Sequence, residues 1–312
     1  MTVNFHRVLV TGGAGFIGSH LVDALVEGGC DVNVLDNLST GSLTNLDRVK
    51  ERFTFYPGDI RDRDVLARAV EGCQVIFHQA AVVSVQQTVE NPVDSATVNE
   101  LGTLNVLEAA RAQRVKRVVL ASSCAVYGND PRLPKHESMP PAPESPYAVQ
   151  KLAGERYAQI YPKLYGVETV CLRYFNVFGP RQDASSPYSG VISIFMTSAD
   201  SGNPPVIYGD GKQSRDFIFV KDVVTANLLA ASTDGVAGRI LNVGTGKSVS
   251  INRLWDIIGR ISGRPFQATY AARRSGDIVA SVAGIEQTAS VLGFRSGYNF
   301  EKGLEITWQW FK

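Results

Sequence analysis

The sequence predicts an α/β fold, a doubly wound parallel sheet followed by a smaller C-terminal α/β lobe. Short apolar runs alternate with helical patterns through somewhat more than the first half of the chain. The first run, Val8-Leu9-Val10, is wholly apolar, as in strands that are buried on both faces of a parallel sheet. It leads directly into a glycine-rich turn and a helical pattern, which is how a βαβ unit begins. Beyond residue 175 the alternation loosens, and we expect the second lobe there.

Composition excludes several classes of protein. Hydrophobic residues make up 44% of the 312 residues and charged residues 20%, which is a globular composition. The formal net charge of +1 gives no basic surface for nucleic acid or membrane. No apolar run approaches the ~18 residues of a membrane span, and the N-terminus lacks a signal-peptide pattern. We therefore expect a cytoplasmic protein whose partners include neither nucleic acid nor membrane.

The cysteines and histidines do not indicate a metal site. The four cysteines have no C-x-x-C spacing and are expected to be reduced thiols. The four histidines do not cluster. Because a metal ion needs several such side chains close together, we expect no metal site.

The glycine-rich turn at residues 11–18 has the spacing of a dinucleotide-binding turn. In that geometry Gly12 allows the tight turn, Gly15 lets the backbone approach a pyrophosphate, and Gly18 lets the helix pack on the strand. The helix predicted over 16–27 would point its N-terminal N–H groups at the phosphates. Such a turn predicts a Rossmann-type sheet; the alternative is a tight turn with a purely structural role.

An acid at the end of the second strand favours NAD as the dinucleotide. The strand predicted over 31–35 ends at Asp36, about 20 residues beyond the turn, where a carboxylate holds the ribose hydroxyls. The same charge repels the 2′-phosphate of NADP. We expect the polar loop 37–41 to complete the adenosine pocket.

The third strand, predicted over 53–56, is followed by two acids with different expected roles. Asp59 lies where the strand ends and is placed to meet the adenine amino group. Asp62 is expected instead to cap the helix predicted over 62–70.

Two further strands end in small residues at the edge where such folds bind ligands. The strand predicted over 74–81 ends in Ala80-Ala81, where small side chains let a dinucleotide lie close. A long helix containing Asn99 is predicted over 94–114. The strand predicted over 117–123 ends at Ser123, which should face the same crevice as the glycine-rich turn.

A Pro-rich loop leads into a helix that carries a tyrosine and a lysine. Ser145 is a good N-cap and Pro146 fits the first helical turn, so a helix is predicted from there to residue 165. Tyr147 and Lys151, four residues apart, lie on one face of it. An ammonium beside a phenol favours the phenolate and lowers its pKa, which suits proton transfer. Taken alone, the same spacing also fits an ordinary solvated helix face.

Domain boundaries follow from where the alternation changes. We predict a dinucleotide-binding domain over residues 1–175, with late strands contributed from the C-terminal half. Residues 176–312 are predicted to form the smaller, interleaved lobe.

With these residues in place, the chain resembles the extended short-chain dehydrogenase/reductase family, and within it the nucleotide-sugar 4-epimerases of the UDP-glucose/UDP-N-acetylglucosamine type. The resemblance runs nearly end to end. Its motifs are TGGAGFIGSH (11–20), DNLSTG (36–41), GDIRD (58–62), HQAA (78–81), SSCAVYG (122–128), SPYAVQK (145–151), RYFNVFGPRQ (173–182), GDGKQSRDF (209–217), NVGTG (242–246) and RRSGD (273–277).

The resemblance implies a reversible 4-epimerisation of a UDP-hexose. Tyr147 would take the proton of the 4-hydroxyl while C4 gives hydride to a tightly bound NAD. Ser123 would hydrogen-bond the reacting oxygen, and Lys151 would hold the nicotinamide ribose and lower the pKa of Tyr147. The 4-keto sugar would then take the hydride back on its other face. The smaller lobe would bind the UDP-sugar, and the chain would form a homodimer through the helices at 94–114 and 147–165.

The resemblance also implies the remaining site residues. Those expected to bind the cofactor NAD are Gly12, Gly15, Phe16, Ile17, Gly18, Asp36, Asn37, Ser39, Gly41, Asp59, Ile60, Ala80, Ala81, Asn99, Tyr147 and Lys151. Those expected to bind substrate are Ser84, Ser123, Asn176, Gln182, Val206, Tyr208, Arg215, Arg274, Asp277 and Ser281. Arg215 has an alternative role in a local ion pair with Asp216.

Differences from other branches of the family narrow the reaction. Sugar-nucleotide dehydratases carry an Asp-Glu pair after the strand-end hydroxyl, and decarboxylases place a Glu there, whereas Cys124-Ala125-Val126 follows here. Uronate epimerases tend to carry an arginine after the Arg-Gln pair, whereas Asp183 stands here. A neutral UDP-hexose is therefore favoured, although a uronate epimerase, a dehydratase and an enzyme restricted to non-acetylated sugars remain alternatives.

The size of one residue decides whether N-acetylated sugars are expected. In the family the fourth position after the Asp of RxGD acts as a gate, and here it is the small Ser281. Gly102 and Gln182 also match positions that line the acetamido pocket. We expect UDP-GlcNAc and UDP-GalNAc to be accepted together with UDP-Glc and UDP-Gal. The alternative is that Ser281 is an exposed loop serine.

Overall fold

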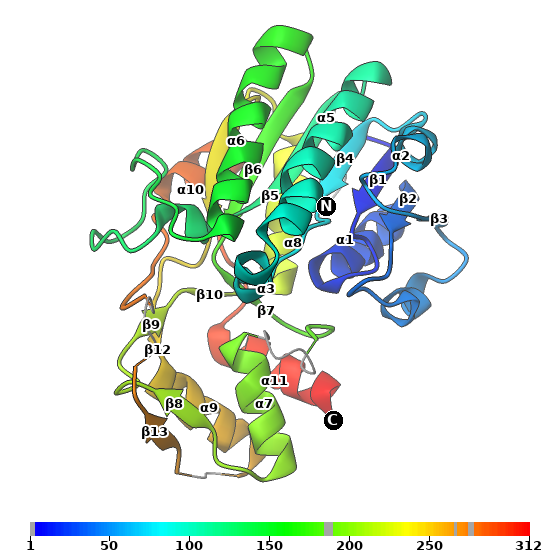
Figure 1. Cartoon of the computed structure of the whole chain (residues 1–312). Helices are drawn as coiled ribbons and strands as arrows, with labels where there is room; N and C mark the ends of the chain where they lie inside the picture. The colour runs from blue at the N-terminus through cyan, green and yellow to red at the C-terminus, as the bar shows by residue number, and fades with distance from the viewer. Residues whose placement is uncertain (1–3, 184–189, 265–266, 274–277) are drawn as a thin grey trace.

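A seven-stranded parallel sheet forms the centre of the structure (Figure 1). The structure is a computed structural model that describes residues 4–183, 190–264, 267–273 and 278–312. The strand order is β11-β6-β5-β4-β1-β2-β3, so the chain winds outward from β1 in both directions. The predicted doubly wound α/β fold is thereby confirmed. The strands are β1 (Arg7–Thr11), β2 (Asp31–Asp36), β3 (Thr54–Pro57), β4 (Val75–His78), β5 (Arg117–Ser123), β6 (Glu168–Tyr174) and β11 (Arg239–Val243).

Helices cover both faces of this sheet, as parallel strands require because each crossover returns over a face (Figure 1). One face is packed by α1 (Phe16–Glu27), α8 (Val220–Ser232) and α10 (Glu286–Leu292). The other face is packed by α2 (Arg63–Val70), α5 (Thr103–Ala112) and α6 (Pro146–Tyr165). The buried apolar side chains therefore form one cluster on each side of the sheet.

The predicted helix over 94–114 is wrong in its interior. The structure has α4 (Pro92–Ala96), a π-helical turn (Thr97–Gly102) and then α5. A π turn holds one residue more than an α turn and shifts the helical phase. It brings Asn99 inward, where its side chain bonds the backbone of Val82.

One predicted strand ends earlier than expected, and one predicted helix cap is confirmed. β4 stops at His78, so Ala80-Ala81 lie in the loop that follows it. Asp62 caps α2, its carboxylate accepting from the N–H groups of Asp64 and Val65 at 3.0 and 3.2 Å, which confirms its predicted capping role. The other short elements are η1 (Leu43–Val49), α3 (Val85–Glu90) and η3 (Cys124–Tyr127).

The second half of the chain builds three small two-stranded sheets around a separate apolar cluster. The sheets lie below the large one in Figure 1. Their strands are β7 (Asn176–Phe178) with β10 (Phe217–Phe219), β9 (Ser214–Arg215) with β12 (Val249–Ser250), and β8 (Val206–Tyr208) with β13 (Thr269–Ala271). The helices packed on them are α7 (Val191–Ser201), α9 (Ile251–Ser262) and α11 (Phe300–Phe311).

A buried ion pair holds α6 to the large sheet. Glu155 on α6 accepts two hydrogen bonds of 2.7 Å from the guanidinium of Arg173 on β6. The hydroxyl of Ser122 on β5 donates to the same carboxylate at 2.6 Å. Because both charged side chains are almost fully buried, each depends on the other for its charge to be tolerated there.

In the described ranges, no helix combines the length and apolar character that crossing a bilayer requires.

Candidate active site

The glycine-rich turn has the geometry of a phosphate cradle. Gly12 has φ of +67°, and a Cβ there would lie 2.7 Å from the backbone nitrogen of Ala80. A Cβ on Gly18 would lie 2.0 Å from the carbonyl oxygen of Gly12, so the helix can approach the turn only without a side chain. α1 starts after Gly15, and no side chain caps its first turn. Its first N–H groups are therefore available to an anion.

Asp36 holds the loops around this turn. Its carboxylate accepts the N–H of Ala14 at 2.9 Å and the N–H of Leu38 at 2.8 Å. Each of its oxygens retains acceptor capacity for a ribose hydroxyl. Asn45 and Ser42 bond the carbonyl oxygen of Ala14, which fixes the loop containing Ser39 and Gly41 against the turn.

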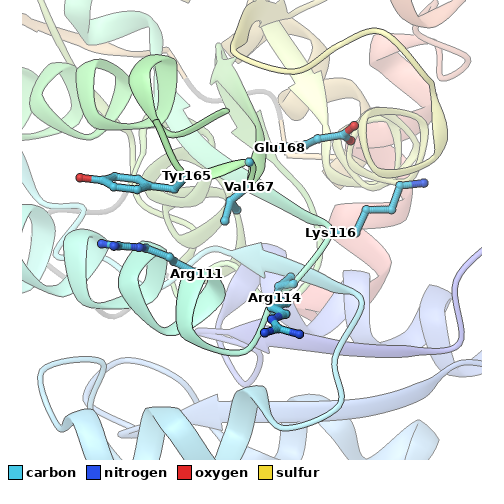
Figure 2. A pocket seen from close by; sticks show the side chains of 8 residues that line it. Arg111, Arg114, Lys116, Tyr165, Val167 and Glu168 are labelled. Carbon is cyan, nitrogen blue, oxygen red and sulfur yellow. The ribbon is translucent and has the colours of Figure 1, made fainter. Parts of the chain in front are cut away.

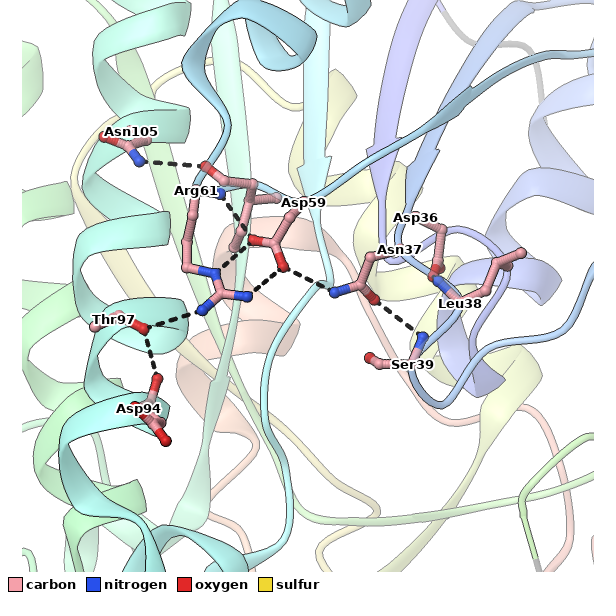
Figure 3. A network of polar contacts seen from close by, with 10 residues as sticks. Asp36, Asn37, Leu38, Ser39, Asp59, Arg61, Asp94, Thr97 and Asn105 are labelled. Atoms are coloured by element: carbon pink, nitrogen blue, oxygen red, sulfur yellow. Dashed lines mark hydrogen bonds and ion pairs between the residues drawn. The ribbon is translucent and has the colours of Figure 1, made fainter.

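Asp59 belongs to a polar network at the same edge, which Figure 3 shows. Arg61 donates to both of its oxygens at 2.9 and 2.8 Å, and the Asn37 amide donates at 2.8 Å. The Arg61 hydrogen bonds lower the pKa of Asp59 to about 2, so it is a carboxylate at neutral pH. This arrangement lets Asp59 accept from an amino group but makes it no proton donor.

The residues present therefore fit NAD. Open helix N–H groups suit its pyrophosphate, the Asp36 carboxylate suits its adenosine ribose, and no Cβ obstructs the turn.

Ser123, Tyr147 and Lys151 meet at the carboxyl edge of the sheet. Ser145 caps α6 by accepting the N–H of Ala148 at 3.2 Å, which fixes where the helix begins. The Nζ of Lys151 lies 5.8 Å from the centroid of the Tyr147 ring. Ser123 ends β5, and its hydroxyl lies close enough to the phenol of Tyr147 to lower the pKa of that phenol. The three predicted catalytic side chains are thus brought together.

In the chain by itself burial dominates the pKa of Tyr147, and the lowering of that pKa by Lys151 stays a prediction. Burial raises the pKa of Tyr147 to about 12, and the nearby Ser123 hydroxyl offsets only part of that rise. Burial also lowers the pKa of Lys151 to about 8. Its Nζ donates to the Ala121 carbonyl oxygen at 3.0 Å. Loss of solvation therefore shifts each of the two groups toward its neutral form.

Asn99 organises the loop after β4. Its side-chain oxygen accepts the N–H of Val82 at 2.8 Å, and its nitrogen donates to the Val82 carbonyl at 2.9 Å and to Gln150 at 2.7 Å. The loop with Ala80 and Ala81 is thereby fixed to α6. This anchoring role was not predicted.

Two predicted substrate residues lie on strands of the smaller lobe, and a third lies beside one of these strands. Asn176 begins β7, and Arg215 ends β9. Ser281 donates its N–H to the carbonyl oxygen of Ser214 at 3.1 Å and is 6% exposed. The alternative of an exposed loop serine is therefore wrong.

The remaining predicted substrate residues are more scattered. Val206 and Tyr208 stand exposed on β8, as a stacking surface requires. Ser84 caps α3 by accepting the N–H of Gln87 at 3.1 Å. Gln182 donates to the Val177 carbonyl at 3.3 Å. Arg274 and Asp277 lie outside the described residues.

Gly102 packs against Ile60. It is buried, and a Cβ there would lie 2.5 Å from the side chain of Ile60. A side chain at this position would therefore have to displace Ile60, and the match of Gly102 to an acetamido-pocket position stays a prediction.

Sequence reasoning missed a second set of residues that fix the loops around the site. Arg181 donates to Asp23 at 2.8 Å, and His20 bonds the Pro180 carbonyl at 2.9 Å, so α1 is joined to the loop before Gln182. Asp216 was expected only as an ion-pair partner of Arg215. Its carboxylate instead accepts from Thr245, Gly246 and Ala283.

His78 is a buried histidine whose two ring nitrogens both have hydrogen-bond partners. It lies buried between the hydroxyls of Thr11 and Thr103 at 2.8 and 2.9 Å. Burial lowers its pKa to about 3, so it stays neutral and has a structural role.

A cavity of about 310 Å³ lies at the opposite, amino-terminal edge of the sheet, as Figure 2 shows. Arg111, Arg114 and Lys116 line it. They follow or end α5, where cations stabilise the carbonyl end of a helix. This cavity therefore belongs to the helix ends and lies away from Tyr147.

Comparison with known proteins identifies the family. Residues 8–244 match the NAD dependent epimerase/dehydratase family. The chain belongs to this family. It is an NAD-dependent enzyme, and the resemblance predicted from its motifs is confirmed.

Several relatives match over nearly their whole length. A protein of Methanocaldococcus jannaschii, named a putative UDP-glucose 4-epimerase, is 43% identical over 98% of both chains. The UDP-N-acetylglucosamine 4-epimerase of Methanobrevibacter ruminantium, solved with UDP-N-acetylmuramic acid, is 42% identical with a TM-score of 0.95, over 100% of this chain and 99% of that one. The UDP-glucose 4-epimerase of Thermus thermophilus, solved with NAD, is 39% identical with a TM-score of 0.88, over 98% of both chains.

We expect Lys151→Met to change how the stability of the NAD-free protein depends on pH. The pKa of Lys151 falls from 10.5 to about 8 on folding, so the folded chain holds this proton less tightly than the unfolded chain. The ammonium therefore opposes folding below the lower value, and this penalty vanishes as pH rises to the upper one. The parent should gain stability relative to the variant across that window.

Urea unfolding at successive pH values measures this difference. Lys116→Met, which removes an exposed ammonium, is the control. A parent-to-variant difference that stays constant across the window would contradict the assignment.

Proposed function

We propose that this enzyme catalyses the reversible 4-epimerisation of a UDP-hexose through a 4-keto intermediate. The observation that carries the proposal is the meeting of Ser123, Tyr147 and Lys151 at the sheet edge that also bears the phosphate cradle. Full-length relatives named as UDP-sugar 4-epimerases support it.

In the proposed mechanism, the chain's residues orient the sugar and move one proton. Tyr147 takes the proton of the 4-hydroxyl as C4 is oxidised and returns it when C4 is reduced. Ser123 donates a hydrogen bond to the reacting oxygen, and Lys151 holds the nicotinamide ribose from its place on α6. When bound, NAD supplies the hydride acceptor, and its positive nicotinamide favours the Tyr147 phenolate. The hydride and proton both return, so no net oxidation occurs.

We propose the division of binding that the sequence predicts. Residues 1–175 would bind NAD, with the first N–H groups of α1 on its pyrophosphate and Asp36 on its adenosine ribose. Residues 176–312 would bind the UDP-sugar, with Asn176, Arg215 and Arg274 on the diphosphate. Val206 and Tyr208 would hold the uracil, and Asp277 the uridine ribose.

The proposed substrates include N-acetylated sugars. Ser281 is small and buried beside the strand that carries Arg215, so its position is set by the fold rather than by a free loop. The neighbour solved with UDP-N-acetylmuramic acid supports room for an acetamido group. Cys124 lacks the carboxyl group expected for dehydration. Asp183 is an acid, whereas a uronate would be met by an arginine.

Tyr147→Phe should lose most epimerase activity and keep its NAD. Removing a positioned proton acceptor costs roughly 10²–10⁴-fold in rate, and the ring still fills its place. The measurement separates the products formed from UDP-Glc, UDP-GlcNAc and UDP-GlcA, and the cofactor content is read after denaturation. Tyr157→Phe, on an exposed part of α6, is the control. Undiminished turnover in Tyr147→Phe would sink the mechanism.

Ser281→Tyr should abolish turnover of UDP-GlcNAc and leave that of UDP-Glc within a few-fold. The larger ring fills the space that the acetamido group needs. The two sugars are compared by kcat/KM, with Ser281→Ala as the small control. Equal turnover of both sugars in Ser281→Tyr would show that another residue sets the specificity.

We also propose that two copies of the chain form a homodimer through α4–α6. α5 and α6 lie side by side (Figure 1). The region from α4 to α6 exposes several apolar side chains. Leu101 and Leu164 are 56% and 62% exposed, although such side chains are usually covered in a stable assembly.

A cytoplasmic location is proposed as well, and is supported by four free thiols.

Leu164→Glu should shift the protein to monomers, because it places a charge in the proposed apolar interface. Sedimentation velocity measures the assembly, and Lys163→Glu on the neighbouring exposed residue is the control. A parent that sediments as a monomer would refute the dimer.

A further inference from the structure

Asp216 is a buried carboxylate at the junction of two small sheets. β9 ends at Arg215 and pairs with β12, and β10 begins at Phe217 and pairs with β7. Asp216 is the single residue between them, and it is 0% exposed. The proposed chemistry gives it no role, yet burying a carboxylate is costly unless its charge is well solvated by the protein.

Four hydrogen bonds solvate this carboxylate. Oδ1 accepts the N–H of Thr245 at 2.9 Å and its hydroxyl at 2.6 Å. Oδ2 accepts the N–H of Gly246 at 2.9 Å and that of Ala283 at 3.1 Å. Both oxygens thus face donors only, and an uncharged amide in this place would turn its own N–H groups toward other N–H groups.

Asp216 adjoins three segments that carry predicted substrate contacts. The side chain of Asn176 donates to the main-chain oxygen of Asp216 at 2.9 Å. Arg215 is its neighbour in the chain. Ala283 is two residues beyond Ser281, in a segment whose other backbone groups bond Ser214 and Lys135. Asp216 therefore joins all three segments, two through its main chain and the third through its carboxylate.

The atoms around the carboxylate are closely packed. A Cβ on Gly244 would lie 2.8 Å from Oδ2 of Asp216 and 2.6 Å from the Cβ of Ala283. The turn 243–246 can therefore reach Asp216 only with a glycine at this position. A small change in the Asp216 position would move the turn and the segment with Ser281 together.

We propose that Asp216 is a positioning residue that sets Asn176, Arg215 and the 281–283 segment as one surface for the UDP part of the substrate. This inference rests on the proposed UDP-sugar function. It assigns Asp216 no contact with the substrate, and its effect is exerted through the residues that it holds.

Thr245 offers a test that leaves the carboxylate in place. Thr245→Val removes the hydroxyl donor to Oδ1, and Thr245→Ser restores it. In calorimetry on the NAD-loaded protein with UDP alone as the probe, we expect Thr245→Val to bind UDP about tenfold more weakly, since a hydrogen bond to a charged group is lost. Thr245→Ser should bind UDP as the parent does.

Asp216→Asn is the stronger variant. We expect UDP binding to weaken about a hundredfold, because donors then face donors. KM for the UDP-sugar should rise in step while kcat at saturation stays within a few-fold, and the NAD content should not change. If Asp216→Asn does not fold, the Thr245 pair decides the question.

The outcomes separate the inference from the proposed function. UDP affinity unchanged in Thr245→Val overturns the inference, and so does a loss of NAD that parallels the loss of UDP, since that would mark general damage to the fold. A parent that binds UDP but interconverts no UDP-hexose contradicts the proposed reaction and leaves the inference testable by UDP binding. A parent that binds no UDP overturns both.

Discussion

The ion pair between Glu155 and Arg173 sets the position of α6 on the sheet, and the site depends on that position. Arg173 lies in register with Ser122, whose hydroxyl donates to the same carboxylate. One buried contact therefore aligns the helix with two neighbouring strands. Going back from Glu155 by single turns reaches Lys151 and then Tyr147, at the end of the helix that faces the carboxyl edge. Removing either charge would leave the other buried without compensation.

Contacts of a second kind join the cofactor side to the substrate side. The phosphate-cradle helix α1 bonds the loop before Gln182 through His20 and Asp23. Asp216 binds the turn that follows β11, and β11 is a strand of the large sheet. The residues that would hold the sugar are thus fixed in position relative to the sheet that carries Ser123. Hydride transfer requires that kind of shared frame, because the two reacting carbons must meet closely.

Local patterns were sufficient for most of the fold and for the expectation that Ser123, Tyr147 and Lys151 lie close together. Apolar runs bounded by glycine predicted the strands, and Ser145-Pro146 predicted the start of α6 within one residue. The π turn has no comparable local pattern. The raised pKa of Tyr147 depends on burial, and the partners of Asp216 lie 29 to 67 residues away, so neither could be read from spacing. A local pair of Arg215 with Asp216 was the alternative in the sequence analysis, and it gave no sign of the hydrogen bonds from Thr245, Gly246 and Ala283 to this carboxylate.

The π turn at Thr97–Gly102 makes the length of this helical segment matter as much as its composition. The extra residue lets Asn99 face the loop after β4 while Leu107 still faces the core. A homologue with an uninterrupted α-helix here would need one residue fewer to keep both inward. An alignment with such a homologue should therefore place a one-residue gap in this turn. Without the gap, Asn99 would be paired with a residue that points elsewhere.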